Sequence, residues 1–278
     1  TGTSNSGFGA ATLFANTTGS NNVAFGTQAL RYNTTASNNT AVGYQAGYSN
    51  TVGDISAFGY QSLYANTTGY YNNFFGYQTG YTNSTGAQNT AMGSQTLYLN
   101  TTGDANTAYG FQSLYSNTTG SYSTAIGYQA GYTNTTGGYN VFVGRLAGYT
   151  NNADNNVAIG SSSLTYNTTG TNNSALGFGS LNGNTTGSSN TGIGQYALQA
   201  NTTASNNTAV GYQAGYTNAT SPNNTSVGYQ SMYTNAGANN TATGYRSAYA
   251  NTTGDYITAF GAEALAANTT GTSNSAIG

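Results

Sequence analysis

The sequence of 278 residues lacks cysteine, histidine and tryptophan, and it has a single proline, Pro222. Disulfide bonds, thiolate chemistry and the common zinc sites need cysteine or histidine, so all three are excluded. The only basic residues are three arginines, which means that lysine is absent too. Because the usual general bases and nucleophiles are missing, we expect no enzymatic activity and no cofactor.

Charge is also scarce. Charged residues make up 3% of the chain and the net charge is −2, whereas about a quarter of a typical soluble chain is charged. No basic surface is available to neutralise phosphates, so we expect no nucleic-acid partner. The chain has no run of 18 apolar residues, so we expect no membrane span.

What the sequence has in excess is repetition. The segment NTTASNNTAVGYQAGY occupies residues 33–48 and returns unchanged at 201–216. A glycine closes each Asn-Thr-Ala-apolar-Gly pentad; of the sixteen intervals between these closing glycines, thirteen have a length of seventeen and three are one residue shorter. The closing glycines are Gly9, Gly26, Gly43, Gly59, Gly76, Gly93, Gly110, Gly127, Gly144, Gly160, Gly177, Gly194, Gly211, Gly228, Gly244, Gly261 and Gly278.

This period predicts an all-β fold. Helical solenoids need repeats of roughly 30 residues or more, and the Thr, Tyr, Asn and Gly found here disfavour helix interiors. We therefore predict a parallel β-solenoid, or β-roll, with one turn of 16–17 residues per repeat and two strands of about five residues in each turn. Residues 1–278 would form one continuous solenoid of about sixteen turns. Because the sequence begins and ends inside the pattern, we expect it to be a window of a longer array.

A column of asparagines follows the closing glycines at a distance of seven residues. Many of them start Asn-Thr-Thr, so they are candidate N-glycan acceptors; alternatively, they form an Asn ladder in which stacked amides hydrogen-bond from turn to turn. Asn50, Asn151 and Asn235 keep the asparagine where the glycan motif is lost, which favours the ladder. The candidate residues are Asn16, Asn33, Asn66, Asn83, Asn100, Asn117, Asn134, Asn167, Asn184, Asn201, Asn218, Asn251 and Asn268.

The residues just before each closing glycine alternate in size. Alanine or glycine stands two residues before it, and an apolar residue such as Val42 or Val210 stands one residue before it. We expect Val42 and Val210 to enter the core. The small residues would then face either the inner wall of the solenoid or a neighbouring chain, and the sequence leaves both open.

Tyrosine recurs in two columns, one residue and five residues after the closing glycine. Such rows can bind sugar rings or other chains, or they can stiffen the sheet by stacking on one another. The first column contains Tyr44, Tyr60, Tyr77, Tyr128, Tyr212, Tyr229 and Tyr245. The second, the predicted Tyr ladder, contains Tyr48, Tyr64, Tyr81, Tyr98, Tyr115, Tyr132, Tyr149, Tyr216, Tyr233 and Tyr249.

The pentads at residues 123–127, 156–160 and 274–278 read STAIG, NVAIG and NSAIG. They resemble the S-V-A-I-G motif of trimeric autotransporter adhesin heads, and similar repeats are seen in phage tail-fibre-like and microbial surface proteins. The resemblance implies a left-handed parallel β-roll, three chains packed side by side, and binding to host matrix or other cells.

Together these features predict a structural, non-enzymatic protein of an extracellular fibre or filament, resembling an adhesin or a tail fibre, that associates with itself. Its expected partners are further copies of the chain, in a homo-oligomer or an end-to-end filament, with glycans or cell surfaces as additional candidates. One alternative is an ice-binding solenoid that uses threonine rows such as Thr17, Thr34, Thr67, Thr101 and Thr118. Another is a carbohydrate-binding adhesin that uses the tyrosine rows.

Overall fold

The computed structural model describes residues 2–278. Within them no helix forms, and seventeen short strands follow one another in chain order. The predicted parallel β-solenoid is confirmed, and residues stacked in successive turns are mostly seventeen positions apart in the chain. The chain divides into two compact units, and each is described by itself: unit 1 ends at Asn140 and unit 2 comprises Val141–Gly278.

Every strand has three residues. Unit 1 holds β1 (Ser6–Phe8), β2 (Val23–Phe25), β3 (Thr40–Val42), β4 (Ser56–Phe58), β5 (Asn73–Phe75), β6 (Thr90–Met92), β7 (Thr107–Tyr109) and β8 (Thr124–Ile126). Unit 2 holds β9 (Val141–Val143), β10 (Val157–Ile159), β11 (Ser174–Leu176), β12 (Thr191–Ile193), β13 (Thr208–Val210), β14 (Thr225–Val227), β15 (Thr241–Thr243), β16 (Thr258–Phe260) and β17 (Ser275–Ile277).

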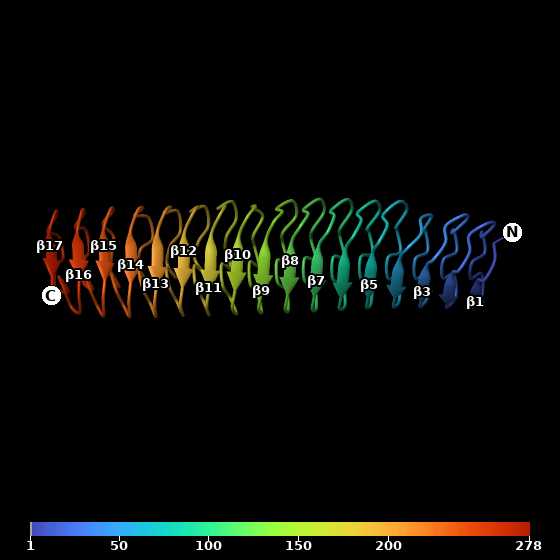
Figure 1. The fold of residues 1–278 in the computed structure, drawn as a ribbon, viewed down its shortest axis with the longest axis horizontal. Coiled ribbons are helices and arrows are strands. Elements are labelled where there is room, and N and C mark those ends of the chain that lie inside the picture. Colours follow the sequence, from blue (N-terminus) through green and yellow to red (C-terminus); the bar gives the residue numbers. More distant parts are fainter. Residues whose placement is uncertain (1) are drawn as a thin grey trace. The chain divides into compact units, whose positions relative to one another are not determined.

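Within each unit, every strand pairs in parallel with the next strand along the chain. In unit 1 the arrows from β1 to β8 run in the same direction in Figure 1, and β9 to β17 repeat the arrangement in unit 2. Ala91 lies beside Ala108 across a full-length repeat, and Ala41 lies beside Ala57 across a short one. The three short repeats therefore lose their residue outside the strands and keep the strand register.

Only one strand forms in each turn, so the prediction of two five-residue strands is wrong. The backbone after the closing glycine is left-handed at two positions, as at Gln61 (φ 50°) and Leu63 (φ 54°). A strand needs φ near −120° throughout, so these two residues convert the second side of the turn into a chain of tight bends. This side still bonds to its neighbours, for example through Leu63 N–H to the carbonyl of Thr79 at 2.9 Å.

The closing glycines from Gly9 to Gly261 are required by both conformation and space. Gly177 has a φ of +128°, and a Cβ built on it would lie 2.7 Å from the carbonyl carbon and oxygen of Gly194 in the next turn. A side chain there would collide with backbone that cannot move without breaking the ladder. The glycine period in the sequence thus records where successive turns come closest.

The core is thin and consists of small residues facing leucines. Ala91 and Ala108, in the middle of their strands, have no exposed surface, and Leu97 and Leu114 fill the opposite side. Leu97 has a φ of 50°, a left-handed conformation that costs roughly 1–2 kcal/mol in a residue other than glycine. Complete burial of a leucine side chain contributes about 1.5–3 kcal/mol, which offsets the strain.

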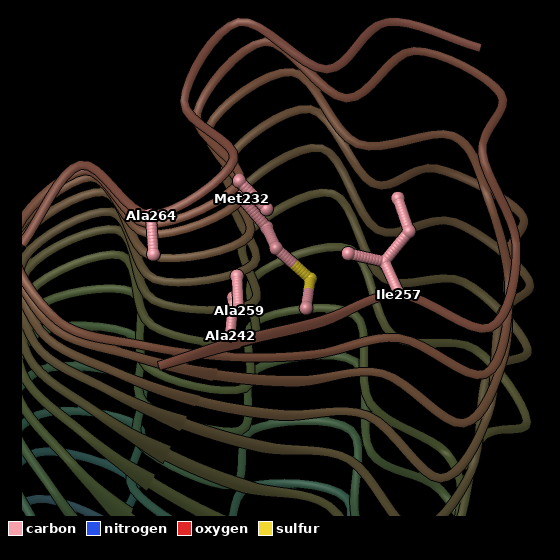
Figure 2. Close-up of a cluster of buried hydrophobic side chains, with 6 residues drawn as sticks. Met232, Ala242, Ile257, Ala259 and Ala264 are labelled. Carbon is pink, nitrogen blue, oxygen red and sulfur yellow. The ribbon is translucent and has the colours of Figure 1, made fainter. Parts of the chain in front are cut away.

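In two turns, core volume is conserved by exchange between columns. Where glycine replaces leucine at Gly80, the strand residue Phe74 takes the place of alanine, and a Cβ on Gly80 would overlap the Phe74 ring. Gly148 and Phe142 repeat the exchange in unit 2. In the last turns, Ile257 fills the space beside Ala248 together with Met232; Figure 2 shows Met232 and Ile257 directed into the same interior as Ala242 and Ala259.

A double-mutant cycle tests this exchange. Phe74→Ala alone should leave a cavity and lower the free energy of unfolding by about 3–5 kcal/mol, and Gly80→Leu alone should overfill the same space. Together they recreate the alanine and leucine pair found at Ala91 and Leu97, so urea unfolding should show the double variant at least about 1 kcal/mol more stable than the sum of the single effects.

The cycle at Phe142 and Gly148 provides an independent repeat in unit 2. Additive effects in both cycles would contradict the exchange.

Candidate functional site

The outer face of each strand carries the apolar residues expected inside. From β2 to β16 each strand buries its middle residue and leaves the two flanking residues exposed or half-buried; Phe25 is 48% and Val42 36% exposed. The expectation that Val42 and Val210 enter the core is wrong. Side chains alternate along a strand, and the inner space admits only the alanine column; the small residues face the inner wall of the solenoid.

These outward residues form what we call the outer apolar column. Neighbouring members touch: the rings of Phe58 and Phe75 stack with centroids 4.8 Å apart. All members are exposed or half-buried, and Thr243 is the one polar residue among them. The column comprises Phe8, Phe25, Val42, Phe58, Phe75, Met92, Tyr109 and Ile126 in unit 1, and Val143, Ile159, Leu176, Ile193, Val210, Val227, Thr243, Phe260 and Ile277 in unit 2.

The predicted Tyr ladder is confirmed as a stack of rings. In unit 1 the run from Tyr48 to Tyr132 has ring centroids 4.9–5.3 Å apart and interplanar angles between 4° and 14°. In unit 2, Tyr216 stacks on Tyr233 at 5.0 Å and Tyr233 on Tyr249 at 5.2 Å. Tyr149 occupies the same column position and is half-buried. We call this set the main tyrosine column.

A second tyrosine column stacks beside it. Tyr44, Tyr60 and Tyr77 lie 5.3 Å apart, as do Tyr212 and Tyr229. Burial, followed by the neighbouring phenols Tyr115, Tyr81 and Tyr77, raises the pKa of Tyr98. Because an internal ring has another ring on each face, mainly its edge and hydroxyl remain accessible, and a sugar has no open ring face to stack on.

The Asn ladder is confirmed as well. Asn66 donates from Nδ2 to Oδ1 of Asn50 at 2.7 Å and to the carbonyl of Gly69 at 2.9 Å. Each internal member has no exposed surface. The hydrogen-bonded runs are Asn16–Asn33 and Asn50–Asn66–Asn83–Asn100–Asn117–Asn134 in unit 1, and Asn151–Asn167–Asn184–Asn201 and Asn235–Asn251–Asn268 in unit 2.

The short repeats interrupt this ladder. Asn50 donates to the carbonyl of Val52, two residues on, at 2.6 Å, whereas Asn66 reaches the carbonyl three residues on. The missing corner residue thus turns the Asn50 amide away from Asn33, whose Oδ1 is buried without a hydrogen bond. Asn218 also stands outside the runs, because its amide bonds to Ser221, next to the single proline.

Burial also bears on the candidate glycan sites. The Nδ2 of Asn100 makes two hydrogen bonds, to Asn83 at 2.6 Å and to Gly103 at 3.0 Å. A glycan on such a nitrogen would have to be attached before the turns close, and it would prevent at least one of these bonds. Asn16 and Asn268, at the outer ends of the runs, are only half-buried.

The structure also contains a glutamine ladder, which the sequence analysis did not predict. Gln45 donates to Gln28 at 2.7 Å, and Gln61 to Gln45 at 2.8 Å. The signal was present, since glutamine stands two residues after nine closing glycines. These residues are Gln28, Gln45, Gln61, Gln78, Gln95, Gln112, Gln129, Gln213 and Gln230.

The hydroxyl groups of the threonine rows proposed for ice binding form hydrogen bonds within the chain. The hydroxyl of Thr17 donates to the carbonyl of Thr34 at 3.0 Å, and that of Thr101 to the carbonyl of Thr118 at 2.9 Å. A different threonine row lies on the outer strand face, at the first strand position. It contains Thr40, Thr90, Thr107 and Thr124 in unit 1 and Thr191, Thr208, Thr225, Thr241 and Thr258 in unit 2.

Several of the few charged groups are engaged locally. The guanidinium of Arg246 lies 4.4 Å from the ring centroid of Tyr249, and hydrogen bonding to Tyr249 raises the pKa of Arg246. Asp104 and Asp255 each accept a hydrogen bond from a backbone N–H of the preceding turn at 2.7 Å.

Across residues 2–278 there is no pocket and no cluster of three potential metal ligands. The same residues contain no helix that could cross a membrane.

Comparison with known proteins found no family model, curated protein or solved structure that matches this chain.

Removal of one amide from the Asn ladder should show how much that amide contributes to the free energy of unfolding. Asn100→Ala leaves Oδ1 of Asn83 and Nδ2 of Asn117 short of a partner, and each buried polar group left unpaired costs about 1–3 kcal/mol. We expect a loss of about 2–4 kcal/mol in urea unfolding. Asn201→Ala is the matched control at the end of a run, because the Oδ1 of Asn201 already lacks a partner. Equal losses at both sites would contradict a cooperative ladder.

The main tyrosine column predicts loss of stability at alkaline pH. Burial raises the pKa values of Tyr64, Tyr98 and Tyr233, so the folded chain retains phenol protons that the unfolded chain releases near pH 10. The contribution of these phenols to the free energy of unfolding is therefore complete below about pH 10, and it declines as the pH rises through the pKa values of the folded state. Urea midpoints measured at rising pH should fall, and Tyr98→Phe should reduce that slope. An unchanged slope in Tyr98→Phe would contradict this origin of the pH dependence.

Proposed function

We propose that this chain is a structural, non-enzymatic protein of an extracellular fibre, which associates side by side with further copies of itself through the outer apolar column. The observation that carries the proposal is the outward position of that column. Ile126, Leu176 and Phe260 are 42%, 45% and 57% exposed, although their types are usually buried.

The column is large enough to act as an interface. If each of its eight side chains in unit 1 exposes about half of roughly 150 Å², unit 1 alone presents on the order of 600 Å² of apolar surface. Monomeric proteins rarely expose continuous apolar patches of more than a few hundred Å². A standard interface takes about 800 Å² from each partner, and the adjoining strand threonines and second tyrosine column extend the surface towards that size.

The period of the column indicates what would cover it. Neighbouring strands are about 4.8 Å apart, and the apolar residue recurs with every strand. A partner that contacts every rung must have the same period, which a second copy of this chain has. With 3% charged residues and a net charge of −2, electrostatic repulsion between copies is small.

The extracellular setting and a role in adhesion rest on the resemblance to autotransporter adhesin heads. Covered ring faces reduce the support for a carbohydrate site on the tyrosine columns, so we give self-association priority over sugar binding.

Ice binding is the second candidate, and the outer strand face is the observation that favours it. Its threonine row and the apolar column run in parallel, with one residue of each on most strands. Thermal hysteresis of the purified chain tests this function. Clear hysteresis would support ice binding, and fibres without hysteresis would support the structural role alone.

Charges in the outer apolar column should abolish association. A buried carboxylate without a partner is strongly unfavourable, so sedimentation should shift to the monomer and electron micrographs should lose their fibres. The variant carries Met92→Glu, Ile126→Glu, Leu176→Glu and Ile193→Glu.

The matched control adds the same charge in the same turns at exposed corner residues and should still associate. It carries Thr85→Glu, Thr119→Glu, Thr169→Glu and Thr186→Glu. Equal behaviour of the two variants, with unchanged circular dichroism, would overturn the proposed interface.

A further inference from the structure

The tyrosine columns concentrate the oxidisable groups of this protein. The chain has 26 tyrosines and no cysteine, histidine or tryptophan. Of the two methionines, Met232 has no exposed surface and Met92 is 48% exposed. A one-electron oxidant that reaches the surface therefore meets mainly phenols.

The columns also hold these phenols in pairs. Tyr98 and Tyr115 have ring centroids 5.2 Å apart and planes only 4° from parallel, and Tyr64 lies 4.9 Å from Tyr48. The spacing comes from the backbone ladder, which fixes one ring above the next. Two reactive groups held in this way react as if at very high concentration.

We propose that the main tyrosine column is a site of oxidative cross-linking, in which peroxide and a peroxidase-class catalyst join phenols of consecutive turns into dityrosine. This inference concerns a modification within one chain, and it does not depend on the proposed self-association.

The reaction balances without any group from the protein other than the two phenols. Each phenol gives up one electron and its hydroxyl proton, which produces two neighbouring phenoxyl radicals. The radicals couple through one new carbon–carbon bond between Cε atoms, and each Cε proton then moves to the phenol oxygen of its own ring to restore aromaticity. One hydrogen peroxide molecule accepts the two electrons and two protons and leaves as two water molecules.

The structure allows the ring carbons to meet. Tyr98 and Tyr115 are half-buried, so their ring edges can be reached by oxidant and can turn about the Cα–Cβ and Cβ–Cγ bonds. An isolated radical can also exchange an electron with the stacked phenol beside it, so that radicals formed anywhere in the run can meet as neighbours. A bond formed there would link consecutive turns covalently, as disulfides do in cysteine-containing proteins.

Two exposed tyrosines provide an internal comparison. Tyr166 and Tyr256 are 55% and 64% exposed, and within residues 2–278 no aromatic ring packs against either of them. If exposure alone governed coupling, these two residues would react first. If stacking governs it, they would remain unlinked in dilute protein.

The experiment treats the dilute, full chain with a haem peroxidase and hydrogen peroxide, and then maps cross-linked peptides by mass spectrometry. We expect dityrosine between residues one turn apart, such as Tyr98 and Tyr115, with the loss of two hydrogen atoms per bond. Cross-links dominated by Tyr166 and Tyr256, or oxidation without dityrosine, would overturn the proposal.

A variant tests the requirement for adjacent phenols while keeping the rings. Tyr77→Phe, Tyr81→Phe and Tyr115→Phe leave Tyr98 among aromatic neighbours that cannot form phenoxyl radicals. Cross-links to Tyr98 should disappear, whereas Tyr166→Phe with Tyr256→Phe should leave the peptide map unchanged. Persistence of Tyr98 cross-links in the first variant would contradict the mechanism.

The glutamate variant of the outer apolar column separates this inference from the proposed function. That variant should remain monomeric and still form dityrosine within each chain. Loss of association with dityrosine still formed would therefore leave the cross-linking proposal standing. Failure to form dityrosine would not contradict the proposed interface.

Discussion

Register between successive turns is the constraint on which the rest of the structure depends. Each strand residue lies beside its counterpart one repeat away, and the corner amides bond over the same interval. A residue must therefore suit the residue above it, the residue below it and its own turn. This triple requirement explains why a degenerate sequence retains fixed columns, and why residues are lost only between strands.

Period and residue type were enough to predict the solenoid and two of its ladders. Asn66 and Asn83 bond as stacked amides, and Tyr81 and Tyr98 stack as rings, because identical side chains one turn apart have few other arrangements. The glutamine ladder could have been predicted on the same grounds. The column of Gln45 and Gln61 was as regular as the tyrosines.

The direction of the apolar residues could not be predicted in this way. Alternation places Ala41 and Val42 on opposite faces, but it does not say which face is inside. The available volume decides: the interior holds alanine opposite leucine, and it admits Phe74 only where Gly80 provides space. Likewise, leucine as a residue type does not predict the left-handed backbone of Leu63. The only indication in the sequence was that glycines such as Gly80 share its column.

The amides of the Asn and Gln ladders all have the same orientation within each unit. Asn33 donates to Asn16, Asn66 to Asn50 and Gln45 to Gln28, so each N–H points towards the earlier turn and each carbonyl oxygen towards the later one. Aligned amide dipoles add, as peptide dipoles do in an α-helix. Each run therefore has a net dipole whose positive end lies at the N-terminal side. When two such runs lie side by side, the antiparallel arrangement has a lower electrostatic energy than the parallel one.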